Sequence, residues 1–186
     1  MRKAVLSLLA AACLPLVAMG SPIIEVGDTI LLPDKANQRV QIYVHGGEAV
    51  QGLVLALLVG DPQSGGGPRP LIEDVDILHG TIFDGNNAGN LPGFYIDQMT
   101  NQAFYHTVAQ VGTVPAEGLL FTLAVDTTGV PQGKYDLSLT SPLEGTTNFA
   151  GLDAAITDGH LVVVPEPASL TLLAIGAVGL VRRHRA

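Results

Sequence analysis

The chain has 186 residues, of which 47% are hydrophobic and only 14% charged, with 17 acidic side chains against 9 basic ones. This length accommodates one ordinary domain with short additions and excludes a large multidomain enzyme. Its 22 glycines, 12 prolines and lack of tryptophan indicate a turn-rich chain. The mean hydropathy of +0.38 is too apolar for a disordered protein.

The N-terminus has the three parts of a secretory signal peptide. Arg2-Lys3 precedes an apolar run over residues 4–18, and small residues surround the expected cleavage site. A retained membrane anchor is one alternative, for which the run is short. Lipoprotein-type attachment at Cys13, the only cysteine, is another. We expect residues 1–20 to form a signal helix whose removal leaves a mature protein without cysteine.

A second three-part segment ends the chain. Two prolines open it, and the uncharged apolar span 168–181 follows. The residues at its start are Pro165, Glu166 and Pro167, and those of its basic tail include Arg182, Arg183 and Arg185. As a helix the span would be about 21 Å long, short of the roughly 30 Å hydrocarbon core, but the arginines can extend it. A buried helix of the domain is the alternative, and it explains neither the prolines nor the arginines.

This segment resembles a PEP-CTERM sorting signal in the order of its three parts and in its place at the C-terminus. The resemblance implies recognition by a membrane-embedded exosortase after export, transient membrane insertion through 168–181, and processing near the Pro-Glu-Pro motif. It further implies a final location in the cell envelope, on the outer surface or in the extracellular matrix. The expected organisation is a signal peptide at 1–20, a domain at 21–164 and the sorting signal at 165–186.

Removal of both signals leaves a strongly acidic protein. The span 21–167 keeps 4 basic residues against all 17 acidic ones, a net charge of −13. A surface that binds nucleic acid needs the opposite sign, so nucleic acid is excluded as a partner. The acidity is typical of an exported soluble domain and suits cation binding or repulsion from acidic polymers.

Between the terminal segments the sequence predicts short strands and no sustained amphipathic helix. Residues 38–45 alternate, and residues 50–59 are apolar on both faces, which predicts a central strand that is covered on both sides or borders an interface. The other expected strands are 119–125, 135–139 and 160–164, with less regular patterns at 24–32, 71–77, 81–83 and 104–109. Turn residues separate these runs, so we predict an all-β fold, an antiparallel β-sandwich.

Strand motifs punctuated by glycine recur along this domain. They are Val26-Gly27-Asp28-Thr29, the runs 50–55 and 118–126, Pro131-Gln132-Gly133 with the strand after it, and Ile156-Thr157-Asp158-Gly159 with the strand after it. Their order resembles a cohesin-like, jelly-roll-type sandwich or a related carbohydrate-binding type. The resemblance implies a protein-interaction or scaffold module. No dockerin-type repeat in the sequence identifies a partner.

No constellation of residues indicates catalysis. Ser64 lies in a glycine-rich loop without the spacing of a nucleophile elbow, and the glycines of 129–134 are too close for a phosphate loop. The histidines of the domain show no spacing that brings two of them to one metal ion. A glycosidase cleft would need facing carboxylates and stacking rings, and tryptophan is absent. We therefore predict a protein that is not an enzyme and requires no cofactor.

Two acidic clusters are candidates for calcium, which prefers six to eight oxygen ligands. The candidate ligands are Asp74, Asp76, Asp84 and Asn86. Asx and glycine residues also form turns for local reasons, which is the alternative interpretation.

Three classes of function remain. The first is an exported non-catalytic surface or matrix protein that acts through surface proteins or extracellular polysaccharide. The second is a glycan-binding module, whose ring platform would come from Phe94, Tyr95, Phe104 and Tyr105. The third is a small secreted hydrolase. The sorting signal and the missing catalytic constellation favour the first class.

Overall fold

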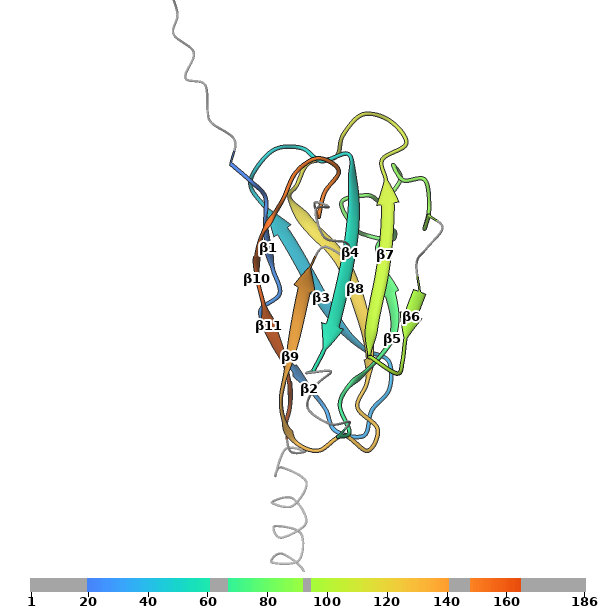
Figure 1. The fold of residues 1–186 in the computed structure, drawn as a ribbon, viewed down its shortest axis with the longest axis vertical. Helices are drawn as coiled ribbons and strands as arrows, with labels where there is room; N and C mark the ends of the chain where they lie inside the picture. The colour runs from blue at the N-terminus through green and yellow to red at the C-terminus, as the bar shows by residue number, and fades with distance from the viewer. Residues whose placement is uncertain (1–19, 61–66, 92–94, 141–147, 165–186) are drawn as a thin grey trace, which may run out of the picture.

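The structure, a computed structural model, describes residues 20–60, 67–91, 95–140 and 148–164. These residues form eleven β-strands and no helix, arranged as two sheets packed face to face (Figure 1). The expected signal helix and the expected C-terminal hydrophobic helix lie outside the described residues.

One sheet has five strands and the other has six. The five-stranded sheet has the order β10 (Ala155–Thr157), β1 (Ile23–Glu25), β3 (Gln38–His45), β8 (Gly118–Asp126), β5 (Leu71–Asp76). The six-stranded sheet has the order β2 (Asp28–Leu31), β11 (Gly159–Val163), β9 (Gly133–Thr140), β4 (Gly52–Val59), β7 (Gln102–Val108), β6 (Tyr95–Asp97). Two long strands, β3 and β4, therefore lie inside different sheets.

Both ends of the domain cross from one sheet to the other at the same height. The chain passes from β1 to β2 at Gly27, whose φ of 67° is readily adopted only without a side chain, and from β10 to β11 at Gly159. The two glycines touch, and the His160 amide donates to the Gly27 carbonyl (3.1 Å). This crossing corrects the prediction of one strand over 24–32.

The same crossing corrects the prediction of a wholly antiparallel sandwich. The first strands pair with the last ones in parallel: β1 with β10, and β2 with β11. Since N- and C-terminal strands both switch sheets together, each sheet receives one parallel pair at its edge.

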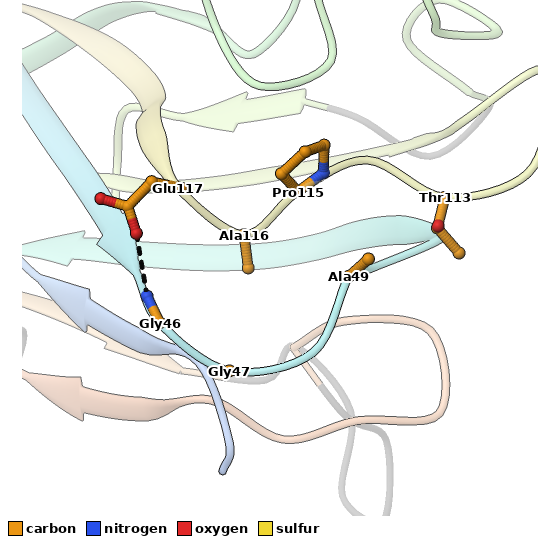
Figure 2. A pocket seen from close by; sticks show the side chains of 7 residues that line it. All are labelled: Gly46, Gly47, Ala49, Thr113, Pro115, Ala116 and Glu117. Atoms are coloured by element: carbon orange, nitrogen blue, oxygen red, sulfur yellow. Dashed lines mark hydrogen bonds between the residues drawn. The ribbon is translucent and has the colours of Figure 1, made fainter. Parts of the chain in front are cut away.

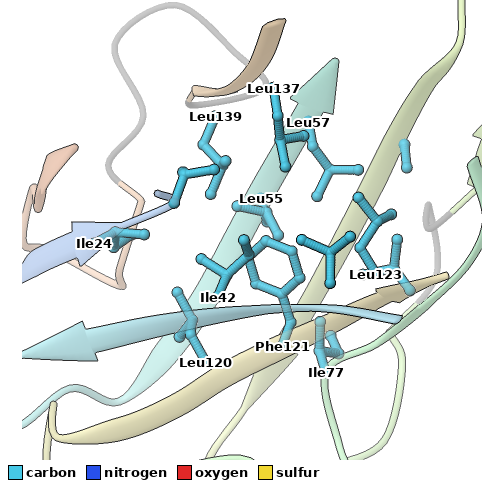
Figure 3. Packing of buried hydrophobic residues seen from close by; sticks show 14 of the residues in the cluster. Ile24, Ile42, Leu55, Leu57, Ile77, Leu120, Phe121, Leu123, Leu137 and Leu139 are labelled. Atoms are coloured by element: carbon cyan, nitrogen blue, oxygen red, sulfur yellow. The ribbon is translucent and has the colours of Figure 1, made fainter. Parts of the chain in front are cut away.

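The core lies between the sheets and is built from alternate residues of the long strands (Figure 3). Side chains that are at most 1% exposed include Ile24, Ile42, Leu55, Leu57, Phe121 and Leu137. Each such side chain contributes about 1.5–3 kcal/mol relative to full exposure. The inward faces predicted for 38–45 and 50–59 are confirmed.

Two local predictions were wrong. Residues 81–83 form a turn in which the Thr81 hydroxyl donates to the Ile77 carbonyl (2.9 Å), and Phe83 is apolar because it packs into the core. The alternation of apolar residues over 119–125 predicts that Leu119 faces inward with Phe121, but a bulge opposite Ile42 and Tyr43 leaves Leu119 half-buried and buries Leu120 instead.

Asn101 ties the two sheets together at one end of the sandwich. Its backbone is left-handed, with φ 55°, and its side chain is fully buried. The amide Nδ2 donates to the carbonyls of Val59 (3.0 Å) and Pro70 (2.7 Å), and Oδ1 accepts from the Ile72 amide (2.9 Å). One side chain thus satisfies backbone groups of β4 and of the start of β5.

Candidate protein-interaction face

The outer face of the six-stranded sheet has an apolar centre. On β4, Leu53, Leu55, Leu57 and Val59 face the core, and the alternate residues Val54, Ala56 and Leu58 face outward. β4 lies between β9 and β7, so these outward residues sit in the middle of the sheet. Val54 and Leu58 are half-buried, and Ala56 is 5% exposed. The prediction of a strand that is apolar on both faces is confirmed.

Two aromatic rings extend this apolar centre toward the sheet edge. Phe104 on β7 lies opposite Ala56 on β4 and opposite Tyr95 on β6. The rings of Tyr95 and Phe104 have centroids 4.8 Å apart and planes tilted by 30°. Tyr95 is 52% exposed. We call the surface formed by Val54, Ala56, Leu58, Phe104 and Tyr95 the apolar face.

The outer face of the five-stranded sheet is polar at its centre. The outward residues of β3 are Arg39, Gln41, Tyr43 and His45. The Tyr43 hydroxyl donates to the Gln41 side-chain oxygen (3.0 Å), so even the ring carries a satisfied polar group. A central strand of a half-solvated sheet normally has this pattern.

A charged cluster borders the six-stranded face on its other side. The imidazole of His160 on β11 contacts Asp28 on β2 through Nδ1 (2.7 Å) and Asp136 on β9 through Nε2 (3.4 Å). The Lys134 ammonium lies 3.5 Å from Asp28. The hydrogen bond with His160 lowers the pKa of Asp28 below its ordinary value, and Lys134 adds to the effect. No sequence spacing could reveal this cluster, because parallel pairing of β2 with β11 brings together residues 132 apart.

All four calcium candidates have backbone hydrogen-bond partners. Asp74 accepts from the Val75 amide, and Asp76 accepts from the amides of Leu78 and His79. Asp84 accepts from the Gly80 amide, and Asn86 exchanges two hydrogen bonds with the Val111 backbone. In the described ranges no group of three or more His, Cys, Asp or Glu residues could hold a metal ion.

The ring platform predicted from sequence is only partly assembled. Tyr95 and Phe104 lie together on the outer face, as described above. The prediction that Tyr105 belongs to this platform is corrected, because alternation along β7 turns its side chain inward and leaves it 5% exposed. Burial there raises the pKa of Tyr105. Phe94 and Ser64 lie outside the described residues, as do the Pro-Glu-Pro motif and the basic tail.

A shallow pocket of about 280 Å³ lies at the end of the sandwich near residue 20. Its lining comprises Gly46, Gly47, Ala49, Thr113, Pro115, Ala116 and Glu117 (Figure 2). The lining offers one charged group, the Glu117 carboxylate, which already accepts a hydrogen bond from the Gly46 amide (3.2 Å). Ligand pockets usually measure 300–1,000 Å³ and present several convergent polar groups, so this pocket is a poor small-molecule site.

The part of the chain that the structure describes holds no helix long and apolar enough to cross a membrane.

Comparison with known families identifies the C-terminal segment. Residues 163–186 match the PEP-CTERM protein-sorting motif. This motif indicates an exported exosortase substrate that is anchored in the membrane at its C-terminus before processing. No curated protein matches the chain.

Solved structures of cohesins share the fold of the domain. A non-cellulosomal cohesin from the archaeon Archaeoglobus fulgidus matches with a TM-score of 0.52 and 16% identity, over 82% of this chain and 97% of its own. The third ScaC cohesin of Acetivibrio cellulolyticus, in complex with the ScaB dockerin, matches with a TM-score of 0.55 and 14% identity, over 77% and 99%. A type III cohesin of the Ruminococcus flavefaciens scaffoldin ScaE matches with a TM-score of 0.54 and 15% identity, over 77% and 87%. The domain is therefore a cohesin-like β-sandwich in fold.

Proposed function

We propose that the domain is a non-catalytic protein-interaction module of an exosortase-sorted surface protein, and that the apolar face is its binding surface. The observation that carries the proposal is β4, a central strand whose outward residues Val54, Ala56 and Leu58 are all apolar. A sheet face that only meets water has no need of this pattern. An apolar centre with aromatic neighbours is typical of the buried core of an interface.

Charge and fold narrow the class of partner. The described residues comprise 14 acidic and 4 basic side chains, a net charge of −10, so a partner with basic residues around an apolar patch would be favoured. Among the similar structures, the ScaC cohesin is seen in a complex with a dockerin. A dockerin-like protein is accordingly the first kind of partner to test.

Site-specific crosslinking tests the proposal in cells that make the protein. A photoreactive amino acid replaces Leu58 on the apolar face or, as the matched control, Gln41 on the centre of the opposite face. We expect a discrete protein adduct from position 58, identified by mass spectrometry, and none from position 41. Equal adducts from both positions would contradict the proposal.

The identified partner then allows binding to be measured. Leu58→Arg places a charge in the centre of the apolar face, and we expect it to weaken binding by about 30-fold or more, the size of a hot-spot residue. Gln41→Arg makes the same change in charge on the other face and should leave the Kd within about twofold. Unchanged binding by Leu58→Arg would exclude this face.

Glycan binding is the second candidate, since the exposed Tyr95 ring beside Phe104 could stack on a sugar. A glycan array separates the two functions. A glycan-binding module would show selective binding that is lost in Tyr95→Ala but retained in Val54→Ser, because only the rings would contact the sugar. A protein interface would depend on both residues.

A further inference from the structure

The described chain leaves the sandwich at the end opposite residue 20 (Figure 1). Val164 follows β11 and donates its amide to the Leu31 carbonyl (3.2 Å). Around this point lie the loop before β3, the β8–β9 turn, the β6–β7 turn and the start of β5, joined by the Lys35–Thr127 and Asn101–Pro70 hydrogen bonds. We call this region the tail end; it comprises residues 30–39, 59–60, 67–73, 97–102, 126–134 and 163–164.

All lysines and arginines of the described residues belong to the tail end. Lys35 and Arg69 lie in its loops, and Arg39 and Lys134 are the second residues of β3 and β9. Four of the 14 described acidic residues belong to the tail end, and a fifth, Asp28 at its border, lies 3.5 Å from Lys134, so the charges of this region are nearly balanced. Nearly all of the net charge of −10 therefore lies on the rest of the sandwich.

The carboxylates of the tail end are turned toward its own backbone. Each of the four accepts an amide hydrogen bond there: Asp34 from Gly129 (2.8 Å), Glu73 from Asn37 (2.6 Å), Asp97 from Met99 (2.9 Å) and Asp126 from Thr128 (2.8 Å). Lys35 and Arg39 are exposed and form no ion pair with any described residue. The tail end thus presents cations to its surroundings more freely than anions.

Exposed apolar side chains lie in the same region as these cations. Met99, at the tip of the β6–β7 turn, is 92% exposed, and Ile30 is 71% exposed. Leu32 and Leu71 are also exposed. Cations mixed with exposed apolar side chains are the composition of surfaces that rest on lipid headgroups.

The short linker between Val164 and the apolar span limits how far the tail end can lie from the membrane. Three residues separate Val164 from Ala168, the first residue of the apolar span, so an extended chain places the two Cα atoms at most about 14 Å apart. The headgroup layer on each side of a bilayer is roughly 5–7 Å thick. When the span lies in the membrane, the tail end is therefore within about a Debye length of the headgroups, where charge is weakly screened.

We propose that the tail end is a membrane-contact surface for anionic phospholipids, which holds the sandwich upright on the bilayer before C-terminal processing. In this orientation the acidic remainder points away from the negative surface and the apolar face stands clear of it. The inference rests on membrane-anchored sorting and does not depend on what the apolar face binds.

Fluorescence quenching in vesicles tests the orientation. The full chain, with Cys13→Ser where the signal peptide is retained, carries one labelled cysteine in place of Met99 or, as the matched control, of Val111. Val111 is apolar and 78% exposed at the far end, where the described residues include no lysine or arginine. In vesicles of phosphatidylcholine and phosphatidylglycerol (7:3) with a headgroup-level quencher lipid, we expect at least threefold stronger quenching at Met99.

Charge variants separate electrostatic contact from simple tethering. Lys35→Ala with Arg39→Ala should weaken the Met99 quenching by at least half in the anionic vesicles. Ala49→Glu with Thr113→Glu makes the same change in net charge at the far end and should not weaken it. Equal quenching of both labels, quenching that survives loss of both cations, or failure of the protein to float with the vesicles would each overturn the proposal. Crosslinking at Leu58 reports on another surface, so either proposal can fail while the other stands.

Discussion

The strands β3 and β4 occupy equivalent places in the two sheets, yet their outer faces differ. Both strands are flanked on each side, and both bury alternate apolar residues in one core. Outside the core, β3 presents Arg39, Gln41 and Tyr43, whereas β4 presents Val54, Ala56 and Leu58. Folding explains the inner faces of both strands. The outer face of β4 needs a further explanation, and the proposed binding partner would supply it.

The largest expected loss of stability lies where the chain crosses between the two sheets. A Cβ atom at Gly159 would overlap the Gly27 backbone, so Gly159→Ala should lower the free energy of unfolding by about 3 kcal/mol or more. Chemical denaturation measures the loss. Gly67→Ala is the control, because its Cβ would meet nothing within 4 Å, and it should be nearly neutral. Equal stability of the two variants would contradict the close crossing.

The two faces of β4 can be compared directly. Leu57 is 1% exposed and faces the core, so Leu57→Ala should cost about 3 kcal/mol in stability. Leu58, its outward neighbour, is half-buried, and Leu58→Ala should cost about 1 kcal/mol or less. Denaturant midpoints at constant m measure the difference. If both substitutions cost the same, the outer face serves the fold and the argument for a partner weakens.

The smallest expected effect lies at the charged border of the six-stranded sheet. The pKa of Asp28 is lower in the folded than in the unfolded protein, chiefly because of its hydrogen bond with His160. The stabilisation of the fold by the Asp28 carboxylate is therefore present above the ordinary aspartate pKa of about 3.9. It is lost as the pH falls through the lower pKa of Asp28 in the folded protein. Asp28→Asn should flatten the decline of stability below about pH 4. Superimposable acid-unfolding curves would contradict this assignment.

Most of the fold could be predicted from alternation of apolar and polar residues. The prediction for 38–45 matches β3 residue for residue, because one buried face gives a clear period of two. The three-residue strands β6 and β10 were missed because so short a run carries no period. The parallel edge pairs were missed because they depend on where the terminal strands meet in space.

The candidate site was predictable in outline only. The doubly apolar run 50–59 indicated a covered or interfacial strand, and that indication led to the apolar face. Both Tyr95 and Tyr105 were candidates: Tyr95 lies on the short edge strand β6, which the sequence does not mark, and Tyr105 lies on β7, whose alternation turns it inward. The gathering of Lys35, Arg39, Arg69 and Lys134 at one end required the complete topology, since these residues are spread over 100 positions.

The parallel pairing of the terminal strands also has a mechanical consequence. β2 and β11 run side by side in the same direction. The N-terminus is reached from the start of β2, through β1, whereas the C-terminal segment follows the end of β11. A pull between the two termini would therefore load the hydrogen bonds between these strands in shear, all at once, instead of opening them one after another. Forced unfolding is governed by the unfolding rate, and a shared load keeps that rate low. A domain whose terminal strands pair in this way is suited to carrying tension between a membrane and a molecule attached to its outer end.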